Sequence, residues 1–197
     1  MNVLIAGDSF GAEWPTKGNN QGWPNLLISD FKITNISRAG VSEYKILKQI
    51  QSIDQRDFDI VVVNHTSPGR VHTRKHPIHS TGLHENCDLL YNDIDGRFSM
   101  FNRALQSAKD WFLYHYDDNY QKDIYQLIRK QIDSIITIPY LAVSHMPISA
   151  EFCIEKNHLD LSNIWARHRG DVNHYSKEGN QLVALTIENN ICEMMKY

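Results

Sequence analysis

The sequence predicts an α/β fold, with helices on both faces of a mainly parallel sheet, and three observations support this. Short apolar segments that stop at turn residues are typical of buried strands. Segments with apolar residues at helical spacing lie between them, so strands and helices alternate along the chain. The 197 residues contain no repeat or linker-like stretch and are enough for one domain, which we expect to span residues 1–197.

Four segments are predicted to be strands. Residues 2–6 (NVLIA) are apolar and stop at Gly7, and residues 33–36 (ITNI) form a second run. Residues 58–64 (FDIVVVN) give the strongest strand prediction, and residues 140–144 (YLAVS) give the fourth. Because ligands of such folds bind beyond the carboxyl ends of parallel strands, the residues that follow these segments are candidates for a functional site.

Helices are predicted in four other segments. Residues 24–31 form a short helix that opens with proline, and residues 42–56 carry apolar residues at helical spacing behind Ser42, a suitable N-cap. The middle of the chain, about 86–137, is predicted to be mostly helical. The chain from Ser176 onward is predicted to be a closing helix.

The composition is that of an ordinary soluble globular protein, with 42% hydrophobic and 22% charged residues. A net charge of −3 gives no reason to expect nucleic acid or an anionic membrane as a partner, and no apolar run is long enough to span a membrane. Cys87, Cys153 and Cys192 have no CxxC spacing, which favours free thiols. The N-terminal residues have no secretory pattern, so we expect a cytoplasmic or otherwise non-secreted protein; a virion component or one released by lysis would look the same.

The segment IAGDSFGAEW (residues 5–14) places Ser9 between two glycines directly after the first predicted strand. It matches the G-x-S-x-G pattern of the α/β-hydrolase nucleophile elbow, but an elbow of that fold follows several strands and only one precedes Ser9. Ser9 is therefore a candidate nucleophile, and the alternative is an ordinary turn or a phosphate-binding loop.

Near the other end of the chain, Asp171 stands three residues before His174. Within a single turn this spacing puts both side chains on one side. A serine hydroxyl is a poor nucleophile near neutral pH, so it needs an imidazole to take its proton and a carboxylate to stabilise the imidazolium. Ser9, His174 and Asp171 are a candidate triad, whereas Asp-x-x-His alone would be a helix N-terminal Asp with an incidental His.

The two motifs together resemble the SGNH, or GDSL-type, family of serine hydrolases. The first block of that family, Gly-Asp-Ser after the first strand, is matched by residues 7–9. The last block, Asp-x-x-His followed by Tyr-Ser and a glycine, is matched within residues 171–179. Gly40 matches the family's glycine after the second strand, and residues 23–24 match its Trp-Pro pair.

The resemblance implies a three-layer α/β/α sandwich of flavodoxin-like character and a serine-dependent acyl transfer, usually ester hydrolysis. It implies that Ser9 is the nucleophile, that His174 is general base and then general acid, and that Asp171 orients His174. The backbone N–H groups of Ser9 and Gly40 would hold the oxyanion. The substrate would be a small-molecule or carbohydrate ester, and the chemistry needs no cofactor.

One block departs from the family pattern. After the third strand the family has Gly-x-Asn-Asp, whose asparagine completes the oxyanion hole, whereas this chain has VVVNHTSPGR (residues 61–70). The family position falls near Pro68, which has no N–H to donate. Asn64 lies earlier, and Thr66 and Ser67 are hydroxyl donors nearer the expected place. Since losing one donor typically costs a factor of about 10²–10³ in rate, the enzyme would be slow or would have rebuilt this corner.

Two further groups are candidates for substrate contact. Arg70, with Arg74 and Lys75, belongs to the basic segment 69–84, and its charge suits an anionic or sugar substrate. The four histidines of that segment are too loosely spaced to favour a metal, so no metal site is predicted. His145 follows a predicted strand and is either a pocket residue or a hydrogen-bonded edge histidine.

Two other functions stay open on the sequence alone. An O-acyltransferase would use the same acyl-enzyme and resolve it with an alcohol or sugar hydroxyl instead of water. A non-catalytic carbohydrate- or partner-binding module on the same scaffold is favoured by the departure after the third strand. The aromatic residues of segment 111–120 are assigned to core packing or a dimer face ahead of a sugar platform, and the oligomeric state is undetermined.

Overall fold

The structure is a computed structural model, which describes residues 1–12, 22–28, 30–85, 87–98, 100–170 and 174–196. Five parallel strands form one sheet in the order β2-β1-β3-β4-β5. They are β1 (Asn2–Gly7), β2 (Lys32–Asn35), β3 (Ile60–His65), β4 (Tyr140–Ser144) and β5 (His158–Asp160). This is the flavodoxin-like order, whose switch point lies between β1 and β3. The predicted α/β fold with a parallel sheet is therefore confirmed.

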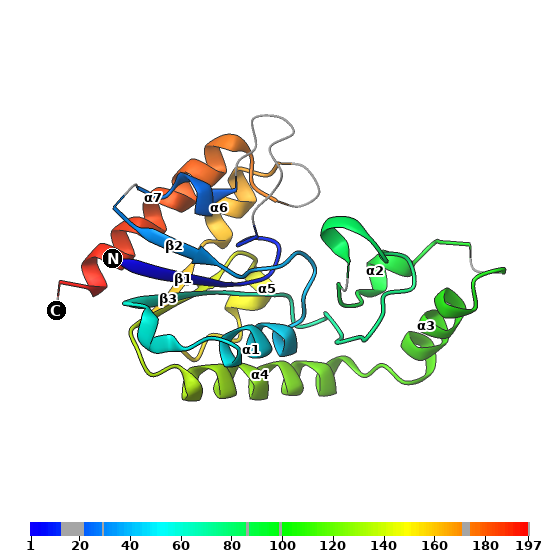
Figure 1. The fold of residues 1–197 in the computed structure, drawn as a ribbon. Helices are drawn as coiled ribbons and strands as arrows, with labels where there is room; N and C mark the ends of the chain where they lie inside the picture. Colours follow the sequence, from blue (N-terminus) through cyan, green and yellow to red (C-terminus); the bar gives the residue numbers. More distant parts are fainter. Residues whose placement is uncertain (13–21, 29, 86, 99, 171–173, 197) are drawn as a thin grey trace.

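The helices follow the strands as Figure 1 shows. They are α1 (Glu43–Gln51), α2 (Tyr91–Ile94), α3 (Arg103–Tyr114), α4 (Asp118–Ile135), α5 (Pro147–Ala150), α6 (Ser162–Arg167) and α7 (Lys177–Met194). Short 3₁₀ turns are η1 (Trp23–Leu26), η2 (Gln55–Asp57) and η3 (Gly82–His84). Among the described helices none is long and apolar enough to cross a membrane.

Two helix predictions need correction. The segment 24–31 holds only the 3₁₀ turn η1, because Leu27 already has an extended backbone. The helical middle is interrupted after α2, where Asp95 is extended and Gly96 has a positive φ of 68°. A glycine in that conformation ends a helix without the steric cost that other residues would meet.

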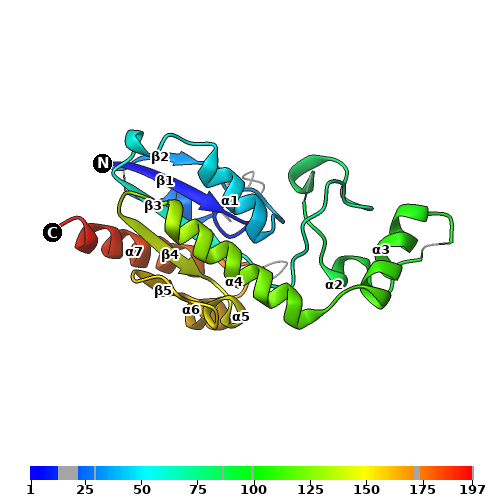
Figure 2. The ribbon, with the colours of Figure 1, turned by 90° about the horizontal axis from the view of Figure 1, so that it is seen from below.

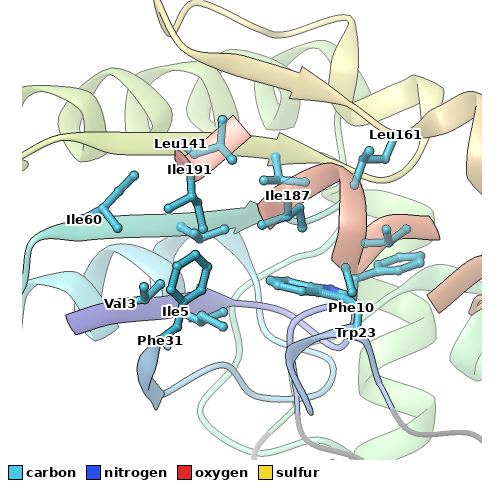
Figure 3. Close-up of a cluster of buried hydrophobic side chains, with 14 of the residues drawn as sticks. Val3, Ile5, Phe10, Trp23, Phe31, Ile60, Leu141, Leu161, Ile187 and Ile191 are labelled. Atoms are coloured by element: carbon cyan, nitrogen blue, oxygen red, sulfur yellow. The ribbon is translucent and has the colours of Figure 1, made fainter. Parts of the chain in front are cut away.

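The sheet is covered on both faces, because alternate residues of each strand point to opposite sides. Val3 and Ile5 of β1 face the cluster under α7, which includes Ile187 and Ile191 (Figure 3). Leu4, and the residues of the other strands that point to the same side as Leu4, face a second cluster under α1 and α4. Burying each such aliphatic side chain stabilises the fold by about 1.5–3 kcal/mol. Figures 1 and 2 show the resulting three layers, with α7 on one face and α1 beside α4 on the other.

One part of the chain extends beyond the carboxyl edge of the sheet. The described residues of segment 87–117, here called the helical arm, comprise α2, α3 and the turn into α4 (Figures 1 and 2). The arm has a small hydrophobic cluster of its own, formed by Leu89, Ile94, Leu105 and Phe112. The amino-terminal half of α4 also projects past the sheet and joins the arm to the main body.

Candidate active site

Ser9 lies in a tight turn at the carboxyl end of β1. Gly7 has a φ of +144°, and a Cβ there would lie 2.5 Å from the Asn64 Cβ, so only glycine fits. The Gly11 N–H donates to the Asp8 carbonyl (3.2 Å) and closes the turn, which leaves Ser9 half-buried between two buried neighbours. The sequence GDSFG thus presents the serine at the edge where ligands of such sheets bind.

Asp8 holds the serine turn from inside. Its Oδ1 accepts a hydrogen bond from the Phe10 N–H (2.9 Å), and its side chain is buried. Burial raises the pKa of Asp8 to about 6, although the Phe10 N–H, the charge of Arg70 and the Thr66 hydroxyl each oppose the rise. Asp8 therefore shapes the turn and does not face solvent as a second acid would.

The start of α7 brings His174 to this turn. The Phe10 ring lies 4.9 Å from the His174 ring and 5.6 Å from the Tyr175 ring, measured between centroids. The loop before α7 is fixed by hydrogen bonds from the Gly170 N–H to the His174 carbonyl (2.7 Å) and from the Gly179 N–H to Ser176 Oγ (3.2 Å). Ser176 is thus the N-cap of α7, where the predicted closing helix begins, and His174 stands just before it.

Asp171, the predicted orienting carboxylate, lies outside the described residues. Of the other two members of the predicted triad, Ser9 directly precedes Phe10 in the chain, and the His174 ring packs against the Phe10 ring. They come from opposite ends of the sequence, and the fold brings them to one edge of the sheet.

Gly40 lies in the loop after β2, close to the serine turn. Its φ is +70°, and a Cβ there would lie 2.6 Å from the Cys87 Cβ. The Gly40 carbonyl accepts hydrogen bonds from the Asp88 N–H (2.6 Å) and from Arg70 Nη1 (3.2 Å). The same loop is joined to β1 through the Arg38 N–H, which donates to the Gly7 carbonyl (3.0 Å). The predicted oxyanion glycine is therefore held in a defined position.

Asp88 reinforces this loop from the arm side. Its carboxylate is fully buried and accepts from the backbone N–H groups of Ser42 and Thr73, each at 2.7 Å. Lys45 Nζ lies 2.8 Å from the same carboxylate and His72 Nδ1 lies 3.2 Å from it. Because a buried carboxylate needs such partners, Asp88 joins α1, the basic segment and the arm at one point.

The residues after β3 have different roles from those expected. Asn64 is fully buried; its Nδ2 donates to the Ala6 carbonyl (3.2 Å), and its Oδ1 lies 2.8 Å from His145 Nε2. This amide supports the sheet in place of the expected oxyanion role. Thr66 is also buried, with its hydroxyl on Asp8. Ser67 alone among the three candidate donors is half-buried and accessible.

Of the two roles considered for His145, the structure shows the hydrogen-bonded histidine at the end of β4 and not the residue that contacts substrate. It is 1% exposed, stacks on Phe10 at 4.6 Å, and has Tyr175 Oη 2.9 Å from its Nδ1. Burial lowers its pKa to about 3, so the ring is neutral in the folded protein. The chain of contacts from Asn64 through His145 to Tyr175 connects β3, β4 and α7 behind the serine turn.

A second buried polar network, which was not predicted from the sequence, connects the end of β3 with α1 and α4. His65 Nδ1 lies 2.5 Å from Glu43 Oε1, and its Nε2 lies 3.5 Å from Glu155 Oε1. Arg129 pairs with both oxygens of Glu155, at 2.8 and 2.6 Å. Burial would raise the pKa of Glu155, but the hydrogen bonds from Arg129, the charges of His65 and Arg129 and the Ile154 N–H together outweigh it and hold the pKa at about 2. The only signal in the sequence is a histidine that ends an apolar strand.

The histidines of the basic segment lie apart from the serine turn. His76 is buried, with its ring 4.7 Å from that of His79, which in turn lies 5.3 Å from His84. His76 Nδ1 accepts from the Ile78 and His79 N–H groups, so this nitrogen is occupied. Among the described residues no group of three or more His, Cys, Asp or Glu side chains is arranged to hold a metal ion.

Comparisons with known proteins give only distant matches. No family model and no curated protein sequence matches the chain. Among solved structures it is similar to a carbohydrate acetylesterase family member from Sinorhizobium meliloti, with a TM-score of 0.47 and 13% identity over 100% of this chain and 99% of that one. It is also similar to a catalytic mutant of an acetylxylan esterase from Geobacillus stearothermophilus, with a TM-score of 0.48 and 10% identity over 96% and 93%. At values this low, the activities of those proteins carry no argument for this chain.

Proposed function

We propose that the protein is a serine-dependent carboxylic ester hydrolase that works through an acyl-enzyme. The observation that carries the proposal is the packing of Phe10, the neighbour of Ser9, against the ring of His174. This contact brings the serine turn of β1 and the histidine before α7 together at the carboxyl edge of the sheet. The match of residues 7–9 and 171–179 to the first and last SGNH blocks supports the same assignment.

In the proposed reaction Ser9 Oγ attacks the ester carbonyl carbon while His174 takes its proton. The tetrahedral intermediate collapses, the bond to the alcohol breaks, and His174 returns the proton to the leaving oxygen. Water then attacks the acyl-serine with His174 again as base, which releases the carboxylic acid and restores Ser9. Asp171 would stabilise the imidazolium in both halves of the reaction.

The oxyanion of each intermediate would be held by the backbone N–H groups of Ser9 and Gly40. Arg70 Nη1 and the Asp88 N–H both donate to the Gly40 carbonyl, so the backbone of Gly40 is fixed before substrate arrives. Electrostatic stabilisation of an oxyanion needs donors that are held in place in this way. Ser67 is our candidate for the third donor, since it is the accessible hydroxyl after β3.

The test is labelling with a fluorophosphonate probe followed by peptide mapping. We expect the wild-type protein to be labelled on Ser9, the Ser9→Ala variant to be unlabelled, and the His174→Ala variant to be labelled at least about 10²-fold more slowly. Exposed His84, the last residue of η3, gives the matched control, and His84→Ala should be labelled at the wild-type rate.

A folded wild-type protein that takes no label on Ser9 would overturn the proposal in favour of a binding module. For a labelled protein, product analysis with and without an added sugar alcohol separates hydrolase from acyltransferase. The hydrolase gives free acid in both mixtures, whereas a transferase gives the new ester as its main product.

A further inference from the structure

A cavity of about 440 Å³ opens between the helical arm and the main body. It is lined by residues from the start of α1, the amino-terminal half of α4 and the helical arm. The residues that carry the argument, here called the Arg70 pocket, are Tyr44, Arg70, Trp111, Tyr116, Tyr120 and Tyr125. The volume is within the range of small-molecule binding sites.

Five of the fifteen residues that line the cavity are Tyr or Trp, and several of these rings are open to a ligand. Tyr44 is 37% exposed, Trp111 is 36% exposed and Tyr120 is 66% exposed. Tyr125 is buried, and its hydroxyl donates to the Thr66 carbonyl (2.8 Å), so its ring is a fixed wall. Because large apolar side chains left in solvent at a concave site commonly mark a contact surface, core packing does not explain this arrangement.

The pocket also contains an unused hydrogen-bond donor. Arg70 Nε is buried and has no acceptor among the described residues, while Nη1 of the same side chain is used by the Gly40 and Asp88 carbonyls. A buried donor without an acceptor costs free energy, so a ligand oxygen placed there would be favoured. The acidic groups on the pocket wall are already engaged: Glu43 contacts His65, and Asp117 caps α4.

We propose that the Arg70 pocket binds a neutral sugar residue of the substrate, with the sugar ring against the exposed aromatic side chains and one of its oxygens on Arg70 Nε. A pyranose has apolar C–H faces and a rim of oxygen atoms, which matches aromatic rings beside the buried polar atoms Arg70 Nε and Ser42 Oγ. A purely apolar ligand would leave Arg70 Nε unpaired. An anionic ligand is disfavoured, because it would approach the carboxylates of Glu43 and Asp117, which line the same cavity.

The pocket is joined to the candidate active site through Arg70. Its guanidinium holds the Gly40 carbonyl, and its charge acts on Asp8, the residue before Ser9. A carbohydrate seated there would place an ester on a neighbouring sugar near Ser9. This catalytic meaning rests on the proposed function, whereas the binding of sugar by the pocket does not.

Binding is tested first in the Ser9→Ala protein, which cannot turn over an ester. Xylotetraose, chitotetraose and maltotetraose are titrated calorimetrically, and we expect at least one to bind with a dissociation constant of about 1 mM or below. Tyr120→Ala removes an exposed ring and should weaken this binding at least about tenfold, as should Trp111→Ala. Tyr114→Ala is the matched control, because Tyr114 is 71% exposed on α3 and does not line the cavity; it should change binding by less than about twofold.

Trp111 packs on Phe112 and Tyr116, so loss of binding in that variant counts only if its circular dichroism is unchanged; Tyr120 has no such contact among the described rings. Failure of all three oligosaccharides to bind overturns the inference, as does equal binding by Tyr120→Ala and the parent.

Measurements of turnover separate a failure of this inference from a failure of the proposed function. Tyr120→Ala should lose at least about tenfold in kcat/KM on an acetylated oligosaccharide and keep its p-nitrophenyl acetate activity. A protein that binds sugar through Tyr120 but hydrolyses neither ester retains this inference and refutes the hydrolase.

Discussion

Asp8 is a buried carboxyl beside the candidate nucleophile, and its titration gives a prediction about stability. Its pKa is about 6 in the folded protein, because of burial, and near 4 in an unfolded chain. The ionised form is thus disfavoured by folding, so this group lowers stability as the pH rises from about 4 to 6 and keeps that effect above pH 7. A difference of about two between the pKa of Asp8 in the folded and in the unfolded protein corresponds to about 3 kcal/mol in the free energy of unfolding.

We therefore expect Asp8→Asn to raise the free energy of unfolding by about 1–3 kcal/mol at pH 8 and to change it little at pH 4. Urea unfolding of both proteins across this range measures the difference. An equal effect at both pH values would mean that the carboxyl does not titrate with a raised pKa.

Ser67 gives a prediction about catalysis. If its hydroxyl is the third oxyanion donor, Ser67→Ala should lower kcat on p-nitrophenyl acetate by about 10²-fold and leave KM within a factor of about three. Thr73→Ala changes a hydroxyl farther along the same segment and is the control. A Ser67→Ala enzyme with the wild-type kcat would assign the third donor elsewhere.

At these positions sequence reasoning succeeded where the chemistry is local. The glycines around Ser9 indicated a turn, and a closing helix was predicted from Ser176 onward, because both depend on a few adjacent residues. Asn64 and His145 could not be placed the same way. Their roles depend on each other across 81 positions, a pairing that no local pattern reveals.

Among the secondary-structure elements, α4 is fixed to the segment between β4 and β5 by the buried pair of Arg129 and Glu155. Both side chains are almost completely buried, and Arg129 also donates to the Ser149 carbonyl at 2.8 Å. Removing one partner leaves a charge in the interior without compensation, which costs about 3–5 kcal/mol. We expect this loss for Glu155→Leu, measured by urea unfolding.

The double variant Arg129→Met, Glu155→Leu should recover part of that loss, because no unpaired charge remains. If the double variant is less stable than Glu155→Leu, the two residues contribute through separate contacts and not as a pair.

Strands buried on both faces were predictable because their apolar runs are continuous, as in β1, β3 and β4. The edge strand β5 was not, since its three residues are only partly buried and show no period. The short helices α5 and α6 were missed because each is too brief to carry an apolar stripe. The helical middle was predicted in type but not in its breaks, which depend on Asp95 and Gly96.

In the whole molecule, the segment after β1 and the start of α7 meet, although they lie far apart in the sequence. The Trp23 N–H donates to Asn180 Oδ1 at 3.0 Å, so the segment after β1 is joined directly to α7. The alternation of strands and helices predicted this layered arrangement, because a parallel sheet requires its crossovers. The position of the helical arm could not be predicted in this way, because its apolar residues pack against each other and not against the sheet.

The arm and the sheet should therefore differ in stability. The arm cluster of Leu89, Ile94, Leu105 and Phe112 is small and separate from the two clusters that cover the sheet, and such units open at lower free energy than the core. We expect amides of α3 to exchange with deuterium at least about tenfold faster than those of β1 and β3.

Leu105→Ala should speed exchange in the arm alone, whereas Ile187→Ala, which creates a comparable cavity under α7, should speed exchange throughout the sheet. If Leu105→Ala accelerates exchange equally in β1, the arm and the sheet unfold as one unit. If the arm and the sheet unfold separately, sugar binding to the Arg70 pocket should slow exchange only in α3 and the first half of α4. If they unfold as one unit, it should slow exchange everywhere.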